Sequence, residues 1–240
     1  MALLAPDITE RPSTVRIHTD LYQGTEEWIA ARCGMLTASE MSLILTPTFK
    51  AAKNEKERSH LYELLAQRIT GFVEPRFISD DMLRGRDDEI EALSLYAKHY
   101  AQTEAVGFIT NDKWGFTLGY SPDAIVDSDG LVECKSRRQK YQIETFVVNV
   151  AEQTIPADYV LQIQTGLLVS ERSWCDLVSY SGGLPLAVIR THADEAIQEK
   201  ILAAAGDFEH RLRDAMDRYR ETVASTRAIP TKRIEREILA

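Results

Sequence analysis

The expected fold follows from one stretch of sequence, SPDAIVDSDGLVECK at residues 121–135. Short apolar runs at 124–126 and 131–134 flank Asp129-Gly130, a pair typical of tight hairpin turns, so we expect two antiparallel strands here. Side chains two residues apart on a strand face the same side. Glu133 and Lys135 therefore project together, and the turn brings Asp123 alongside them.

Two carboxylates and an amine at one spot suit metal-assisted chemistry on phosphate. Carboxylate oxygens hold hard divalent cations such as Mg²⁺, and the backbone carbonyl of Cys134 is a natural additional ligand. Such a cation polarises a phosphodiester and lowers the pKa of bound water, while a lysine positions that water or stabilises developing negative charge. Taken alone, the short pattern is more typical of a surface hairpin with a solvated aspartate and a Glu–Lys pair.

Periodicity and turn signals predict one α/β domain over residues 1–240, with a central mixed β-sheet flanked by helices. Its core is expected at about 26–191, followed by an amphipathic helix at about 193–225 and a loose tail. A short helix or turn is expected at 26–31. The capping-box pattern of Thr37 and Glu40 predicts that a helix starts at Thr37 and continues through the apolar run 41–45. Other helices are expected at 54–70, 80–101, 142–150 and 156–169, and further strands at 105–109, 115–118, 174–180 and 186–190. Residues 1–20 have an irregular pattern, and neither a repeat nor a linker is evident.

Composition narrows the class of protein. The 240 residues are 44% hydrophobic and 27% charged, which is ordinary for a globular chain. No apolar run approaches the roughly 18 residues of a membrane-spanning helix. The stretch MALLAPDITERP does not have the pattern of a secretory signal. The three cysteines are scattered along the sequence, which fits a reduced, cytoplasmic protein. With 28 basic and 37 acidic residues the net charge is −9, which excludes an entirely basic surface but not a basic channel.

Motifs of several other enzyme classes are absent from the sequence. No GxxxxGK, HExxH, GxSxG or GxGxxG pattern occurs, so NTPase, zinc-protease, serine-hydrolase and dinucleotide-binding functions have no support.

Five stretches in order over about residues 28–180 resemble the lambda-exonuclease or YqaJ-like viral recombinase branch (phage alkaline exonucleases) of the PD-(D/E)xK nuclease superfamily. The resemblance implies a restriction-endonuclease-like core. The stretches are Trp28-x3-Arg32-x-Gly34-x2-Thr37-Ala38-Ser39, Gly85-x3-Glu89-x2-Ala92-x3-Tyr96, Ser121-Pro122-Asp123-Ala124 with Glu133-Cys134-Lys135, Tyr159-x2-Gln162-x-Gln164-x2-Leu167, and Trp174-x-Asp176-x2-Ser179-Tyr180.

The resemblance assigns catalytic roles to the hairpin and to one helix. Asp123, Glu133 and the Cys134 carbonyl become metal ligands, and Lys135 becomes the catalytic lysine. Glu89 becomes an additional carboxylate near the metals, although its acidic neighbours also suit an exposed helix glutamate. The implied cofactor is Mg²⁺, two ions per site, with Mn²⁺ as an expected substitute.

The resemblance also implies contacts to DNA. Arg32 and Ser39 match positions that hold the phosphate at a 5′ end. Without the family, the preferred interpretation is that Arg32 makes a surface ion pair and that Ser39 helps to cap a helix. Ser121, Arg137, Lys140 and Tyr159 are further candidates, and Gln162 is the better candidate than Gln164, because two residues apart on a helix do not share a face. Asp112 is the nearest match to an upstream aspartate of the family, but its spacing to Asp123 is one residue too long.

The function implied is that of a Mg²⁺-dependent 5′–3′ exodeoxyribonuclease. Such an enzyme loads on double-stranded DNA ends, processively releases mononucleotides from the 5′-ended strand and leaves a 3′ overhang for recombination by single-strand annealing. The implied partners are further copies of the chain, which form a ring-shaped trimer, and a single-strand annealing protein. The implied location is the cytoplasm of a bacterial host, with the protein encoded by a phage or prophage. Alternatives are another nuclease of the superfamily, such as an endonuclease or RecB-like repair nuclease, and a non-catalytic DNA-end-binding protein. A Cas4-like version would need a cysteine cluster that Cys33, Cys134 and Cys175 do not form.

Overall fold

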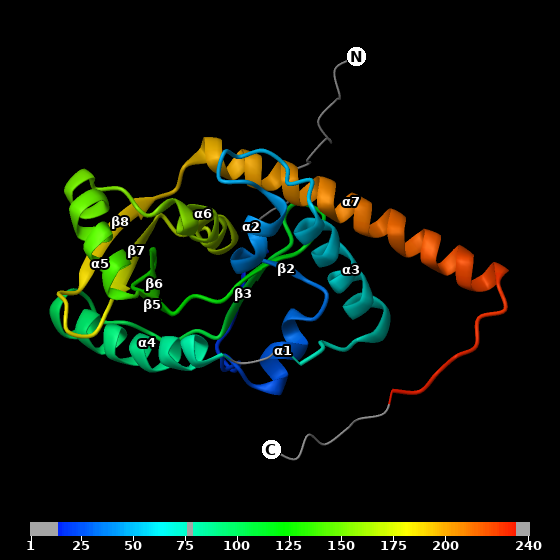
Figure 1. Cartoon of the computed structure of the whole chain (residues 1–240), viewed down its shortest axis with the longest axis horizontal. Coiled ribbons are helices and arrows are strands. Elements are labelled where there is room, and N and C mark those ends of the chain that lie inside the picture. The colour runs from blue at the N-terminus through cyan, green and yellow to red at the C-terminus, as the bar shows by residue number, and fades with distance from the viewer. Residues whose placement is uncertain (1–13, 76–78, 234–240) are drawn as a thin grey trace.

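The structure, a computed structural model, describes residues 14–75 and 79–233 (Figure 1). Its elements follow one another along the chain as β1 (Arg16–His18), α1 (Glu26–Arg32), β2 (Leu36–Thr37), the 3-10 turn η1 (Ala38–Glu40), α2 (Met41–Ile44), α3 (Glu55–Thr70), α4 (Asp80–His99), β3 (Phe108–Asn111), β4 (Leu118–Tyr120), β5 (Ala124–Val126), β6 (Gly130–Ser136), α5 (Gln139–Glu144), the π-helix η2 (Thr145–Val150), α6 (Ala157–Ser170), β7 (Trp174–Tyr180), β8 (Ala187–His192) and α7 (Glu195–Ser225).

The strands form two four-stranded mixed sheets, in the orders β1-β3-β4-β2 and β5-β6-β7-β8. Strands β2 and β4 are parallel, as are β6 and β7, and the other neighbours are antiparallel. The predicted α/β class with mixed sheet and flanking helices is confirmed, with the strands divided between two sheets. The division falls at Ser121-Pro122-Asp123, where proline has no N–H to donate to a ladder.

The expected hairpin is present. Strands β5 and β6 pair antiparallel with Ala124 opposite Val132 and Val126 opposite Gly130. Its turn includes Asp127 at φ 45°, in the left-handed region that aspartate tolerates better than most residues. Glu133 and Lys135 lie on β6, and Asp123 immediately precedes β5.

Some short elements differ from the sequence-based expectation. The region expected to be irregular contains β1, and β2 ends at Thr37, the residue at which the next helix was expected to start. Both are two or three residues long, and they are strands because β3 and β4 accept and donate their hydrogen bonds, which is a non-local cause. The helix expected at 142–150 begins earlier, as α5, and continues as a π-helix.

Helix α6 lies at the centre of the fold. Figure 1 shows α4 and α6 on opposite sides of the β5–β8 sheet, and α6 also packs on β3 and β4. Its Gly166 allows the closest approach, because a Cβ there would lie 2.7 Å from the ring of Tyr120. The face of β6 that carries Leu131, Glu133 and Lys135 is thereby directed at α6, while Val132 and Cys134 pack against α4.

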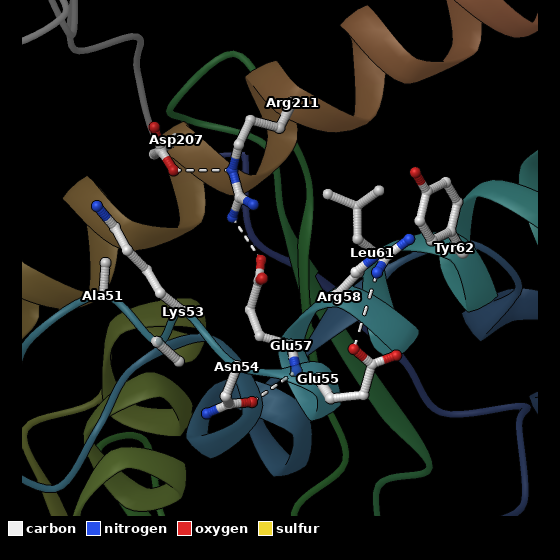
Figure 2. Close-up of a pocket in the computed structure, with 11 residues that line it drawn as sticks. Ala51, Lys53, Asn54, Glu55, Glu57, Arg58, Leu61, Tyr62, Asp207 and Arg211 are labelled. Carbon is white, nitrogen blue, oxygen red and sulfur yellow. Dashed lines mark hydrogen bonds and ion pairs between the residues drawn. The ribbon is translucent and has the colours of Figure 1, made fainter.

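Helix α7 packs along α3 and then continues past it (Figure 1). Arg68 of α3 makes two hydrogen bonds of 2.8 and 2.6 Å to Glu209. Figure 2 shows Arg211 reaching from α7 toward Glu57 across a cavity of about 760 Å³, and it donates to Glu57 at 2.5 Å and to Asp207 at 3.0 Å. Because these charges pair with one another, we interpret this cavity as part of the packing contact between α3 and α7. None of the helices in the described ranges is long and apolar enough to cross a membrane.

Candidate active site

A second cavity, of about 240 Å³, lies where the hairpin meets α6, α4 and the segment from α1 to η1. Most of the residues expected at the site line it. They are Arg32, Ser39, Glu89, Ser121, Asp123, Glu133, Cys134, Lys135 and Gln162, joined by Gln23, Trp28, Thr37, Ala38 and Tyr120.

Glu133 is the centre of the hydrogen-bond network in this cavity and is only 1% exposed. It accepts hydrogen bonds from the Tyr120 hydroxyl at 2.8 Å, from Lys135 Nζ at 2.7 Å and from the Gln162 side-chain amide. Lys135 Nζ also donates to the Gln162 Oε1 at 3.1 Å. The carboxylate, amine and amide thus form a closed triangle in which the position of Lys135 is set from both β6 and α6.

The other two carboxylates lie close enough to interact with Glu133. Asp123 accepts the backbone N–H of Cys134 at 2.5 Å. Burial, and then repulsion by Glu133 and Glu89, raise the pKa of Asp123 well above its usual range, and burial followed by Glu133 raises the pKa of Glu89. Burial lowers the pKa of Lys135, but attraction by Glu133 and Asp123 outweighs it, so the pKa rises and the ammonium stays charged.

These donors fit a hard divalent cation. After burial, repulsion by Glu133 is the next cause that raises the pKa of both Asp123 and Glu89, and a bound cation would relieve this crowding of negative charge. Within the described ranges, no three His, Cys, Asp or Glu side chains already converge on one ion position. The carboxylates of Glu133 and Asp123 are instead held by the hydrogen bonds given above, which a cation would have to replace in part.

One wall of the cavity carries donors that suit an anion, and we call it the anion pocket; its residues are Trp28, Arg32, Thr37, Ser39 and Ser121. The Arg32 guanidinium donates to the hydroxyls of Ser121 and Thr37, both at 3.2 Å, and lies 4.2 Å from the centre of the Trp28 ring. The Ser39 hydroxyl is 3.3 Å from that of Thr37. A guanidinium that is oriented by stacking and that donates to two hydroxyls can bind a phosphate with several hydrogen bonds at once.

Three of the expected DNA contacts lie outside this cavity but next to it. The Tyr159 ring is 5.3 Å from Lys135 Nζ, and its hydroxyl accepts a hydrogen bond from Arg137 at 2.6 Å. Lys140 lies further along, at the start of α5. These three residues extend the polar surface beyond Lys135.

Two doubtful candidates are placed elsewhere. Asp112 lines a separate cavity with Thr14 and His18, and its carboxylate is 3.9 Å from Arg16. Gln164 is buried and binds the His192 carbonyl and the Asp194 N–H, so it faces away from Gln162 as the helical spacing predicts. The structure does not bring either residue to the carboxylates.

Five residues of the cavity wall were not predicted as site residues, and three of them, Tyr120, Thr37 and Trp28, make hydrogen bonds to residues that were. Tyr120 stands immediately before Ser121-Pro122-Asp123, but no local signal distinguishes a tyrosine bound to Glu133 from a core tyrosine. Thr37 and Trp28 lie within the N-terminal motif, but neither was predicted to have a role at the site. The Trp28 indole in fact donates to Ser121 at 3.0 Å.

Comparison with protein families matches residues 27–173 to the YqaJ-like viral recombinase domain. The chain belongs to this family. Because YqaJ-like domains are nucleases, the chain is an enzyme, and the resemblance found in its motifs is confirmed.

Solved structures agree with membership in the YqaJ-like family. An alkaline exonuclease from Laribacter hongkongensis, LHK-Exo, is 29% identical with a TM-score of 0.72, and the match covers 83% of this chain and 98% of that one. LHK-Exo in complex with dAMP matches at 30% identity and a TM-score of 0.73 over the same shares. A phage-related exonuclease from Haemophilus somnus 129PT, 12% identical with a TM-score of 0.53 over 76% of this chain and 96% of that one, shares the fold. Comparison with curated proteins gives no significant match.

Proposed function

We propose that this YqaJ-like nuclease is a Mg²⁺-dependent 5′–3′ exodeoxyribonuclease that digests the 5′-ended strand of linear double-stranded DNA to mononucleotides. One observation carries the proposal. The same cavity holds the Glu133–Lys135–Gln162 triangle with Asp123 on one side and the Arg32 anion pocket on another. A hydrolytic centre beside a pocket for a terminal phosphate is the arrangement that an enzyme acting from a 5′ end requires.

Each residue has a role in this proposal. Asp123, Glu133 and the Cys134 carbonyl would hold Mg²⁺, with Glu89 beside them and Mn²⁺ as a substitute; the expected number is two ions. When bound, the metal supplies polarisation of the phosphodiester and a lowered pKa for water. Lys135 remains protonated and donates to the oxygen on which negative charge develops. Gln162 holds the Lys135 amine in place.

The direction of digestion would follow from the phosphate contacts. Arg32, Ser39 and Ser121 would hold the terminal 5′ phosphate, so that the first phosphodiester lies at the carboxylates. Arg137, Lys140 and Tyr159 would then contact DNA beyond the scissile bond. The mononucleotide in the LHK-Exo complex is a product of the size that this geometry would release.

The setting that we propose is phage-type homologous recombination in the cytoplasm of a bacterial host. The 3′ overhang would be passed to a single-strand annealing protein. A ring-shaped homotrimer would explain processive digestion, because a closed ring cannot leave its DNA, and it would let the chain keep a net charge of −9 while basic groups face a channel. Residues 1–240 would act as a single nuclease domain.

The test is digestion of a 5′-phosphorylated linear duplex and of a closed circular duplex, with Mg²⁺ or chelator. We expect mononucleotides from the linear DNA only, released from 5′ ends and only with Mg²⁺. Lys135→Ala should abolish release, whereas Lys113→Ala, which removes a lysine paired with Glu171 at 3.8 Å, should not. Discrete fragments from the circle would indicate an endonuclease. Salt-sensitive end binding without any hydrolysis would indicate an end-binding protein instead.

A further inference from the structure

A row of alternating cations and aromatic rings leads away from Lys135. The Tyr159 ring lies between Lys135 and Arg137, with Lys135 Nζ and the Arg137 guanidinium carbon each 5.3 Å from its centre. The same guanidinium carbon is 5.2 Å from the centre of the Tyr141 ring, and Lys140 Nζ is 4.6 Å from that ring. We call Lys135, Tyr159, Arg137, Tyr141 and Lys140 the cation–aromatic row.

The row is built by the spacing of three elements. Lys135 and Arg137 are two apart at the end of β6, so they share the face that is directed at α6. Gln162 and Tyr159 are three apart on α6 and share one helix face, with Gln162 over Lys135 and Tyr159 next to Arg137. The first turn of α5 then adds Lys140 and Tyr141. The order of the row therefore runs outward from the hydrolytic centre.

The row and the anion pocket lie on opposite sides of β6. The pocket includes Ser121, just before β5, and β5 borders β6 on one edge. The row ends on α5, whose Gln142 donates to the Ser179 carbonyl of β7, and β7 borders β6 on the other edge. A DNA strand whose 5′ end is held in the anion pocket must cross the carboxylates of Asp123 and Glu133 before it reaches the cation–aromatic row.

The outer end of the row is available to a ligand. The Tyr141 side chain is exposed, at 41%. Among the described residues, no carboxylate pairs with Arg137 or Lys140; the guanidinium of Arg137 donates to the Tyr159 hydroxyl, and its Nε is buried without a hydrogen-bond partner. An exposed ring between two cations that lack a carboxylate partner is suited to a ligand that combines flat bases with phosphates.

We propose that the cation–aromatic row binds the part of the cleaved strand that lies 3′ to the scissile bond, with Tyr141 stacking on one of its unpaired bases. This inference rests on the proposed function and adds to it a stacking residue and a path for the strand. Arg137 and Lys140 hold the phosphates on either side of that base. The ligand class is therefore single-stranded DNA with a 5′ phosphate, several nucleotides long.

The test uses 5′-phosphorylated oligonucleotides of two, four and eight nucleotides with the full chain in Ca²⁺. Stacking strengths for aromatic residues predict that Tyr141→Ala weakens binding of the eight-nucleotide strand roughly 5- to 150-fold and leaves the dinucleotide unchanged. Tyr141→Phe should retain the wild-type affinity. Tyr62→Ala is the matched control, because Tyr62 is also exposed, at 54%, and has a cation, Arg58, over its ring, but lies on α3 beside the cavity of Figure 2.

A second readout reports stacking directly. We place 2-aminopurine at successive positions of the eight-nucleotide strand and expect its fluorescence to be quenched at one or two positions beyond the first nucleotide. Tyr141→Ala should remove that quenching and Tyr62→Ala should not. If wild type binds and hydrolyses DNA but Tyr141→Ala changes neither affinity nor quenching, the row is not a strand track. If wild type neither binds nor hydrolyses DNA, the proposed function fails, and this inference with it.

Discussion

Replacement of Arg32 tests whether the anion pocket recognises the 5′ phosphate. The guanidinium has two N–H groups on neutral hydroxyls, those of Ser121 and Thr37, and is oriented by the Trp28 ring. Arg32→Ala removes these donors, whereas Arg32→Lys keeps the charge but loses the planar fork and much of the stacking. If the pocket recognises the phosphate, both variants should lose the preference for a 5′-phosphorylated end.

The size of the effect follows from the hydrogen bonds exchanged. A hydrogen bond between neutral groups contributes about 0.5–1.5 kcal/mol, and one to a charged group about 1.5–3 kcal/mol. A 5′ phosphate that accepts from Arg32 makes at least one charged hydrogen bond that a 5′ hydroxyl does not make, which is worth about 1.5–3 kcal/mol. At about 1.4 kcal/mol per factor of ten, this corresponds to a preference of roughly 10- to 150-fold in kcat/KM.

The assay compares kcat/KM on linear duplexes with a 5′ phosphate or a 5′ hydroxyl. Wild type should prefer the phosphate by the factor given above, Arg32→Ala should show no preference, and Arg32→Lys should fall between them. The control is Arg58→Ala, an exposed arginine of α3 that lines the cavity in Figure 2 and should keep the full preference. The reasoning would be refuted if Arg32→Ala lowered the rates on both substrates equally and left their ratio unchanged.

Three further predictions concern the metal, the lysine and the core. A saturating divalent cation at about 100 times its Kd should raise the Tm of wild type by roughly 5–10 °C. The cation should leave the Tm of Asp123→Asn nearly unchanged. Without metal, this variant should be at least as stable as wild type, because it lacks a buried charge that other carboxylates repel. An equal Tm shift in both proteins would exclude Asp123 as a ligand. Burial lowers the pKa of Lys135, but the neighbouring carboxylates raise it further, so its ammonium is lost only above the usual lysine pKa of about 10.4. Loss of the Lys135 proton should therefore not lower kcat/KM below about pH 10. Any fall in the pH profile below that value should persist in Lys135→Arg. Gly166→Ala should destabilise the fold by about 1–3 kcal/mol in urea unfolding, because the new Cβ would lie 2.7 Å from the Tyr120 ring. Gly206→Ala should instead stabilise α7 by about 0.5–1 kcal/mol, because the nearest atom to its new Cβ lies 3.7 Å away. Similar effects in the two helices would contradict the close packing of α6 on β4.

The local elements of the site could be predicted from the sequence. The turn Asp129-Gly130 between two apolar runs predicts the β5–β6 hairpin, and the structure pairs these runs as expected. Alternation along a strand places Glu133 and Lys135 on one face, and helical spacing separates Gln162 from Gln164. These predictions succeed because each depends on residues only a few positions apart.

The boundaries of the short strands could not be predicted in the same way. Strands β1 and β2 have two or three residues and no pattern of their own, so their hydrogen bonds come from β3 and β4, about 80–90 positions later. Strand β4 begins three residues later than the apolar run suggests, since its ladder is set by β2 and β3. Pairing between distant segments is a property of the tertiary structure.

The sequence by itself determined the hairpin, the order of its charged side chains and the family. Only the tertiary structure decided that Tyr120 and Gln162 bind Glu133, that Arg32 meets Ser121 and that Asp112 stays apart. The physical reason is that these contacts join β4, α6 and α1 to β6 or to the loop before β5, and the packing of α6 through Gly166 against Tyr120 sets their distances. Packing of this kind depends on shapes that meet across the fold, and no local pattern encodes it.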